Sequence, residues 1–402
     1  MSARPRLILI DALRGLAALA VVAVHTPHWP TGPLLSHPFG LAGFVLDFGR
    51  LGVPLFIVIS GFCIHHATRA AWNGTRLSDV SWATFFQRRL RRLYVPYVGA
   101  IALGLLSLSF VSGQDAVRNC LPHDLPIHLL MLQNVVGWNA GGVGNGPLWT
   151  IGLEMQLYLL YPLVFWSSRF LGWRTTLFGV LSITALWTCF VPALSPISLG
   201  RWTVTFTDPE MWAFEYWFIW CLGAYTCELT ATEREVPRRW GVVLLFVFAF
   251  VGVMTDHRTL FVLQNSTFGG QVLQPWIDFL HFLGRRVVHS ASILSFGTAF
   301  SLVIVLGQQL EKSGLLVARR LMKPLSVVGL ISYSLYLTHI PVVVILRSIV
   351  PIAADNTSVL PWILRYVIDV PVCVLFAVGY FMVVERHFLR HPAATQMQSP
   401  VS

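Results

Sequence analysis

The chain has 402 residues, of which 55% are hydrophobic and only 11% are charged, and its mean hydropathy is +0.67. Soluble domains carry about 25% charged residues, so this composition excludes an ordinary soluble protein and indicates an integral membrane protein. The net charge of +10 does not indicate nucleic-acid binding, because the basic residues stand in short clusters between apolar runs rather than in one stripe.

Ten apolar segments are long enough to cross a bilayer core of ~30 Å at about 1.5 Å per helical residue. They cover residues 7–26, 50–68, 93–112, 147–166, 175–193, 211–229, 240–254, 290–308, 325–350 and 361–384. The sequence therefore predicts an all-α integral membrane protein with about ten transmembrane helices. Two shorter apolar patches, 39–48 and 127–137, are expected to lie at the interface or to re-enter the membrane.

Most of the Arg and Lys residues outside these segments fall on one side of the membrane if the N-terminus is cytoplasmic. The positive-inside rule then predicts that both termini are cytoplasmic and that the long loops 113–146 and 255–289 are external. We expect residues 1–390 to form a single membrane domain, followed by a short polar tail over 391–402. The six cysteines lack CxxC or CxxH spacing, so neither a metal site nor a disulfide framework is expected.

The first apolar segment, Leu7 to His25, carries three ionisable residues. A charge at the middle of a membrane helix costs about 2.5–3.5 kcal/mol, so such groups normally face a protein interior or a polar cavity. Arg14 and His25 share one helix face but lie about 16 Å apart along the axis, so they cannot pair. They can instead hold two ends of a long ligand, with the guanidinium at a phosphate and the imidazole in proton transfer. The alternative is that Arg14 pairs with Asp11 and that His25 sits at the water interface.

The second segment contains a Ser60-Gly61 pair within Gly52 to His66. Small residues of this kind let a ligand approach a membrane helix closely, but they also let a neighbouring helix do so. Both interpretations, ligand contact and helix packing, remain open at this point.

Residues Phe85 to Tyr97 form a basic amphipathic segment that contains Arg88, Arg89, Arg91 and Arg92. Four arginines so closely spaced point to most sides of a helix. They can anchor the chain to anionic lipid headgroups, or they can clamp a phosphorylated cytoplasmic ligand. The two roles are compatible.

Glu154 lies about seven residues into the fourth segment, with Tyr158 and Tyr161 on the same helix face. An isolated carboxylate is costly there unless it is protonated, paired or facing water. Because no basic residue of its own helix segment neutralises it, a functional role for Glu154 is favoured. Trp149 and the tyrosines can form a surface that stacks on a sugar or lies at the membrane interface.

The ninth segment reads SYSLYLTHIPVV from Ser332 to Val343. Tyr336 and His339 are three residues apart, and Tyr333 lies one turn earlier, so the segment has a polar stripe. Such a stripe can line a cavity or can make hydrogen bonds to neighbouring helices.

Taken together, these segments resemble the membrane-bound acyltransferase-3 family, which includes bacterial O-acyltransferases acting on polysaccharides, lipid-linked sugars and glycosylated small molecules. The matching stretches follow in order along almost the whole chain: Ile10 to His25, Gly52 to Phe62, Arg88 to Tyr97, Pro147 to Leu163 and Ser332 to Val342. Two positions depart from the family pattern. Pro54 stands where many members have Asp, and Glu154-Met155 stands where many have two acids. The soluble extracytoplasmic domain that some members add is not expected here.

The resemblance implies transfer of an acyl group, commonly acetyl, from cytoplasmic acyl-CoA to a hydroxyl group of a carbohydrate or glycoconjugate, in the inner (plasma) membrane of a bacterium. By this comparison His25 is the catalytic base, and from its position Glu154 is its expected catalytic partner. The expected donor-binding residues are Arg14, Ser60, Gly61, Arg88 and Arg92, and the expected substrate-binding residues are Trp149, Tyr158, Tyr336 and His339. The bilayer is the expected surrounding, no metal is required, and no protein partner is indicated.

A different class, a ten-span secondary transporter, would use Asp11, Arg14, His25 and Glu154 as a substrate or proton path. It is disfavoured because no inverted repeat with paired broken helices is evident. A membrane receptor or scaffold would tolerate the loss of all four groups. Exported polysaccharide, lipid-linked oligosaccharide and glycosylated small molecules are all compatible acceptors, and both direct transfer and an acyl-histidine relay are compatible with these residues.

Overall fold

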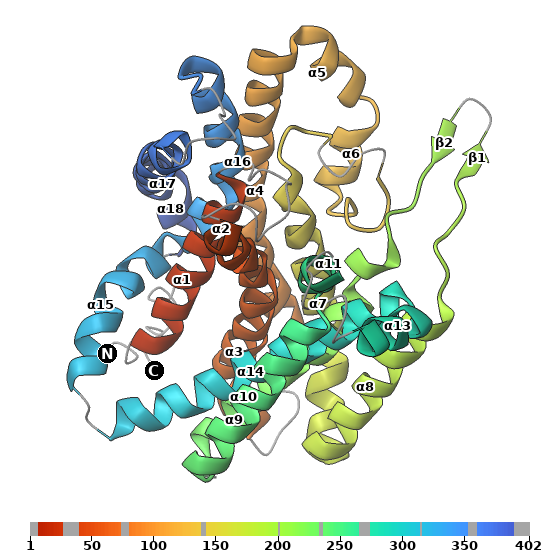
Figure 1. The fold of residues 1–402 in the computed structure, drawn as a ribbon, viewed down its shortest axis with the longest axis vertical. Helices are drawn as coiled ribbons and strands as arrows, with labels where there is room; N and C mark the ends of the chain where they lie inside the picture. The colour runs from red at the N-terminus through yellow and green to blue at the C-terminus, as the bar shows by residue number, and fades with distance from the viewer. Residues whose placement is uncertain are drawn as a thin grey trace, which may run out of the picture.

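A computed structural model describes residues 7–26, 40–73, 80–137, 142–199, 202–232, 236–264, 274–313, 316–352 and 360–389 (Figure 1). The longer helices are α1 (Ile8–His25), α3 (Gly52–Trp72), α4 (Trp82–Ser112), α7 (Trp149–Phe170), α8 (Gly172–Phe190), α9 (Ala213–Ala231), α10 (Arg238–Met254), α14 (Arg285–Lys312), α15 (Leu316–Leu330), α16 (Ser332–Ile349) and α17 (Leu360–Tyr380). The shorter ones are α2 (Gly40–Asp47), α5 (Gln114–Cys120), α6 (Asp124–Leu129), α11 (His257–Gln264), α13 (Gln274–Leu283) and α18 (Arg386–Leu389). The predicted α-helical architecture is confirmed. Its one described exception is the antiparallel pair β1 (Ile197–Leu199) and β2 (Trp202–Val204).

All ten predicted membrane segments coincide with helices. Within the described residues, seven helical segments are long and apolar enough to cross a membrane: Ile8–His25, Gly43–Arg69, Trp82–Ser112, Gly146–Phe170, Arg285–Lys312, Ser332–Ile349 and Leu360–Phe388. The pair α10 and α11 makes an eighth if the 62° bend between them lies within one span. Helices α8 and α9 are less apolar, because Arg174 in α8 and Glu215 and Glu228 in α9 lower the mean hydropathy. The chain is a multi-pass membrane protein, and ten spans stay a prediction.

The predicted segment 325–350 is not one helix. It is divided at Ile331, where α15 ends and α16 begins. The apolar run continues through the break, so hydropathy alone did not reveal it. Just before the break, Gly329 of α15 lies against the backbone carbonyl of Asp11, where no Cβ atom would fit.

The remaining irregular segments also contain helices. The apolar patch 39–48 is mostly helix α2, and the patch 127–137 contains the end of α6 followed by turns. The predicted external loops 113–146 and 255–289 include α5, α6, α11 and α13, which lie beyond the ends of the long helices.

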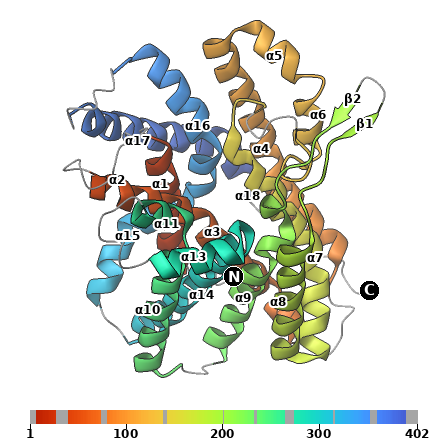
Figure 2. The ribbon, with the colours of Figure 1, turned by 45° about the vertical axis from the view of Figure 1, so that its right-hand side comes forward.

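Helix α1 lies in the interior of the bundle, between α15, α16 and α17 on one side and α3 on the other (Figures 1 and 2). Glycines make this close packing possible. Gly15 lies against the carbonyl of Leu325 in α15, and Gly52 of α3 lies against the carbonyl of Ala17. Within lipid the hydrophobic effect does not drive helices together, so their association depends on close packing. Small residues allow the helix backbones to approach closely enough for such packing.

Contacts along α1 set a common axis for the site. The end of α15 contacts Asp11, near the start of α1, and α16 follows directly. Further along α16, His339 contacts His25 at the end of α1. The two helices α1 and α16 therefore run in the same direction. α3 begins beside the middle of α1, at Ala17, and continues toward the Asp11 end, and α7 runs alongside α3. The positions of other residues can therefore be compared along one axis, from the Asp11 end to the His25 end.

Candidate active site

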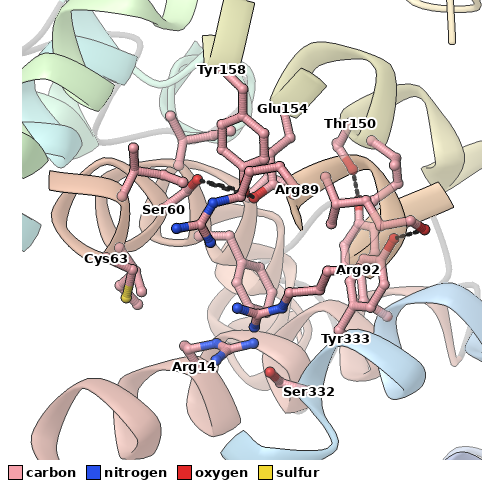
Figure 3. A pocket seen from close by; sticks show the side chains of 18 residues that line it. Arg14, Ser60, Cys63, Arg89, Arg92, Thr150, Glu154, Tyr158, Ser332 and Tyr333 are labelled. Atoms are coloured by element: carbon pink, nitrogen blue, oxygen red, sulfur yellow. Dashed lines mark hydrogen bonds between the residues drawn. The ribbon is translucent and has the colours of Figure 1, made fainter. Parts of the chain in front are cut away.

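A cavity lies among α1, α3, α4, α7 and the start of α16 (Figure 3). The space between its side chains, open mouth and adjoining solvent included, amounts to about 880 Å³. Its lining consists of Arg14, Val53, Phe56, Ile57, Ile59, Ser60, Cys63, Ile64, Arg89, Arg92, Leu93, Thr150, Ile151, Glu154, Tyr158, Ser332, Tyr333 and Tyr336. Five of the segments singled out in the sequence thus meet at one place.

The cavity is strongly cationic. Figure 3 shows the guanidinium groups of Arg14, Arg89 and Arg92 directed into the same space, although they come from two different helices. Glu154 is the one carboxylate among the lining residues, so three cations face a single anion. Taking cations out of water is costly unless an anion compensates for it, and guanidinium groups bind phosphate through paired hydrogen bonds. The arrangement is suited to a ligand with several phosphate groups.

Glu154 is held on the wall of the cavity by two hydroxyl groups. Ser60 Oγ donates to Glu154 Oε1 at 3.0 Å, and the Tyr158 hydroxyl donates to the same oxygen. Trp220 Nε1 in turn donates to Ser60 Oγ at 3.3 Å. In the described part of the chain the hydrogen bonds of Glu154 go to these groups and none goes to His25. The structure therefore brings together three predicted site residues, Ser60, Glu154 and Tyr158, but it does not pair Glu154 with His25.

Aromatic rings line the end of the cavity that is closer to His25. The Tyr336 hydroxyl accepts a hydrogen bond from Thr150 Oγ1 at 2.7 Å and donates to the Pro147 carbonyl at 3.1 Å. The rings of Tyr336 and Phe56 lie edge to face with their centroids 5.7 Å apart. These contacts hold Tyr336 between the cavity and the histidines that follow it.

His25 and His339 lie next to each other beyond Tyr336. Their ring centroids are 5.1 Å apart, and the ring of His339 is 5.7 Å from that of Tyr336. Neither imidazole belongs to the lining of the cavity as the described residues define it. The predicted association of Tyr336 with His339 is present, and His25 joins it from another helix.

The backbone fixes the tautomer of both neutral imidazoles. His25 Nδ1 lies 2.8 Å from the Val21 carbonyl, and His339 Nδ1 lies 2.7 Å from the Tyr336 carbonyl. Because a carbonyl can only accept a hydrogen bond, Nδ1 carries the proton in each ring and Nε2 has a free lone pair. His339 is fully buried, and its Nε2 has no hydrogen-bond partner among the residues that the structure describes. A neutral His25 imidazole in this contact therefore has Nε2 as its basic nitrogen, the tautomer that a general base could use.

Three predicted donor or substrate contacts are placed elsewhere. Arg88 lies on the exposed face of α4, whereas Arg89, which was not chosen from the basic cluster, lines the cavity. Gly61 faces α9, where the Trp220 carbonyl leaves no room for a Cβ atom, so its role is helix packing.

Trp149 packs beside Tyr216, with ring centroids 6.0 Å apart, and does not line the cavity as the structure describes it.

The sequence alone did not single out Arg89. Residues three or four positions apart share a helix face, and both Arg88 and Arg89 stand at such distances from Phe85 and Arg92. Phe85 is buried, so the face that carries it turns inward and takes Arg89 and Arg92 with it. Arg88 and Arg91 are exposed on α4. The cluster therefore serves both predicted roles, with different residues facing the cavity and the surroundings.

Comparison with known proteins identifies the family. Residues 7–382 match the family described as the acyltransferase domain, which is acyltransferase-3. The chain belongs to this family. The membership predicted from five sequence motifs is thus confirmed, and it disfavours the transporter interpretation.

Three relatives illustrate the family. The O-acetyltransferase OatA of Staphylococcus aureus is 26% identical over 353 residues, covering 84% of this chain and 51% of that protein. The peptidoglycan O-acetyltransferase OatA of Listeria monocytogenes is 23% identical over 366 residues, covering 86% of this chain and 51% of that protein. The acyltransferase MdmB of Streptomyces mycarofaciens is 25% identical over 226 residues, or 53% of each chain. The chain spans about half the length of these relatives, and no solved structure matches it.

Proposed function

We propose that the protein is an O-acyltransferase that moves an acyl group, in the first place acetyl, from acyl-CoA to a hydroxyl group of a carbohydrate. The observation that carries this proposal is the cavity with Arg14, Arg89 and Arg92, whose lining includes Tyr336, the neighbour of His339, which in turn lies beside His25. The relatives named as O-acetyltransferases support the choice of acetyl.

The charge of the cavity and the spacing of Arg14 and His25 along α1 both support acyl-CoA as the donor. The three guanidinium groups supply binding sites for the phosphates of CoA. Arg14 and His25 are about 16 Å apart along α1, a distance comparable to the pantetheine arm that separates the phosphates of CoA from its thioester. In this arrangement the arm follows α1, and the thioester reaches the rings of Phe56 and Tyr336, beside the two histidines.

The chemistry follows from the tautomer of His25. Its Nε2 takes the proton of the acceptor hydroxyl as the oxygen attacks the thioester carbonyl carbon. The carbon–sulfur bond then breaks, and the thiolate takes the proton from the imidazolium, so that CoA and an O-acyl ester leave. The Nδ1–H bond to Val21 keeps the ring in the required orientation throughout. Because Glu154 bonds to Ser60 and Tyr158, we assign it to the organisation of the donor path and not to contact with His25.

The proposed membrane arrangement places donor and acceptor on opposite sides. We propose ten spans, in which α8, α9 and the bent pair α10–α11 supplement the seven long apolar helices. With both termini in the cytoplasm of a bacterium and the bundle in its plasma membrane, the Arg14 end of α1 faces cytoplasmic acyl-CoA. His25 then faces the outer side, where an exported polysaccharide is available. One relative is named for peptidoglycan, and we take a cell-envelope glycan as the acceptor class.

The test is acetyl transfer by the full-length protein in detergent, from radiolabelled acetyl-CoA to isolated cell-envelope polysaccharide. We expect His25→Ala to lower turnover by about 10²- to 10⁴-fold, the usual contribution of a general base, and to leave acetyl-CoA binding unchanged. His281→Ala, which removes an exposed imidazole in α13, is the matched control. Normal turnover in His25→Ala would exclude His25 as the base. If the wild-type protein neither binds nor consumes acetyl-CoA, the acyltransferase proposal is wrong.

A further inference from the structure

The last turn of α1, which carries His25, is attached to two other helices. The last carbonyl groups of an α-helix have no partner within the helix. Here the His25 carbonyl accepts a hydrogen bond from Arg347 of α16 at 2.9 Å. The Ala23 carbonyl accepts one from the Thr26 backbone N–H at 3.3 Å and a second from the Tyr366 hydroxyl of α17 at 3.2 Å. The end of α1 is thus capped by side chains that are far away in the sequence.

The carbonyls one turn earlier are satisfied locally. The side chains of His25 and Thr26 donate to the carbonyls of Val21 and Val22, each at 2.8 Å. The orientation of the His25 ring therefore depends on the position of this last turn, and the last turn depends on its attachment to α16 and α17. Without such attachments helix ends fray.

Arg347 lies beside a buried carboxylate, at ion-pair but not hydrogen-bond distance. Asp369 of α17 has no exposed surface, and its Oδ2 lies 4.0 Å from Arg347 Nε. On the other side, Asp369 Oδ1 lies 3.6 Å from Arg365 Nη1. Within the described residues neither oxygen of Asp369 has a hydrogen-bond partner, so the two arginines compensate for its burial by charge alone.

The two arginines have parallel roles at different helix ends. Arg347 caps α1 at His25, whereas Arg365 donates to the Val350 carbonyl at the end of α16, at 2.7 Å. Cationic side chains at a helix C-terminus stabilise both its free carbonyls and its dipole. Asp369 is shared by the two, so the removal of either arginine leaves one ion pair intact.

We propose that Arg347, ion-paired with Asp369, is a positioning residue for the His25 base. This inference rests on the proposed function. Arg347 does not touch the donor cavity within the described residues, and it acts through the backbone of the turn that carries His25. Small displacements matter in such a role, since a shift of about 1 Å in a reacting group can cost about 10²-fold in rate.

The experiment compares Arg347→Gln with Arg365→Gln in the full-length detergent-purified protein, with radiolabelled acetyl-CoA and cell-envelope polysaccharide as substrates. Each variant keeps Asp369 paired with one arginine, so both are expected to fold. In Arg347→Gln we expect kcat to fall about 10- to 100-fold, while the KM for acetyl-CoA changes less than about twofold. Arg365→Gln is expected to keep kcat within about threefold, because it has no contact with α1. Arg347→Lys retains the charge and one donor, so it should recover part of the lost kcat.

Other outcomes separate the two proposals. Equal losses in both glutamine variants would indicate a general structural role and would overturn the inference, as would a wild-type kcat in Arg347→Gln. If Arg347→Gln does not fold, Asp369→Asn carries the same test, because it leaves Arg347 unchanged but without its carboxylate. It should then lower kcat without raising the KM for acetyl-CoA, and a normal kcat would overturn the inference. Full turnover in His25→Ala, or no transfer by the wild-type protein, would instead refute the proposed function on which the inference rests.

Discussion

Arg89 and Arg88 are neighbours in the sequence but lie on different faces of α4, and they offer a direct test of the cavity. Arg89 lines the cavity with its guanidinium directed toward those of Arg14 and Arg92, whereas Arg88 is exposed on the outer face (Figure 3). The change Arg89→Ala removes one of three cations from the cavity, and Arg88→Ala removes an equal charge from the surface. The two variants therefore have the same net charge and differ only in where the charge is lost.

The magnitude follows from the kind of contact that is lost. A hydrogen bond between charged groups contributes about 1.5–3 kcal/mol when it is shielded from water. Because about 1.4 kcal/mol corresponds to a factor of ten in affinity, Arg89→Ala should weaken acetyl-CoA binding by about 10- to 100-fold. The exposed charge of Arg88 is screened by salt over about 8–10 Å, so Arg88→Ala should change the affinity by less than about twofold.

The assay is isothermal titration calorimetry of acetyl-CoA with the detergent-purified protein at physiological ionic strength. Acetyl-pantetheine, which lacks the nucleotide phosphates, is the ligand control, and its affinity should be equal in the wild-type protein and in both variants. The same loss of acetyl-CoA affinity in both variants, or a larger loss in Arg88→Ala, would refute the assignment of the phosphates to this cavity.

Three further experiments test the site and the helix packing around it. Acetyl-CoA should protect Cys63, which lines the cavity, from alkylation by N-ethylmaleimide, and should leave the exposed Cys189 unprotected; equal rates with and without donor would contradict the placement of the donor. Gly61→Ala should lower the free energy of unfolding by about 1–3 kcal/mol, because the added Cβ atom meets a backbone carbonyl of α9. Thermal unfolding measures this loss. The control Gly179→Ala should show none, because its added Cβ atom meets nothing within 4 Å. Glu154→Gln keeps the hydrogen-bond acceptor but removes the anion, so acetyl-CoA should bind about 2- to 10-fold more tightly; weaker binding in calorimetry would show that the carboxylate itself is needed for the donor site.

Much of the architecture was predictable because a bilayer imposes strong local requirements. Every backbone polar group within lipid must be satisfied, so long apolar runs become helices, and all ten predicted segments are helical in the structure. The ionisable residues in those runs were also informative, because a charge in the membrane is costly without a function or a partner. For this reason Arg14, Glu154 and His25 could be chosen as site residues before their positions were known.

It was harder to predict which side of its helix each functional residue lies on, relative to the protein interior. A membrane helix is apolar on all sides, so its hydrophobic pattern does not show which side is buried in protein and which side meets lipid. In the basic segment of α4 the spacing admits both Arg88 and Arg89, and only the burial of Phe85 in the structure shows that Arg89 faces the cavity. The break at Ile331 was missed on the same grounds, since both helices beside it are apolar and the close contact at Gly329 comes from a distant part of the chain.

The sequence by itself determined the class of protein, the helical segments, the family and the residue types of the site, because each of these depends on composition and on spacing within a segment. Only the tertiary structure decided which partner each side chain has. It placed Glu154 beside Ser60, His25 beside His339, and the Arg347 side chain against the last carbonyl of α1. These contacts join helices separated by tens to hundreds of residues, and they depend on how whole helices pack, which no local pattern in the chain encodes.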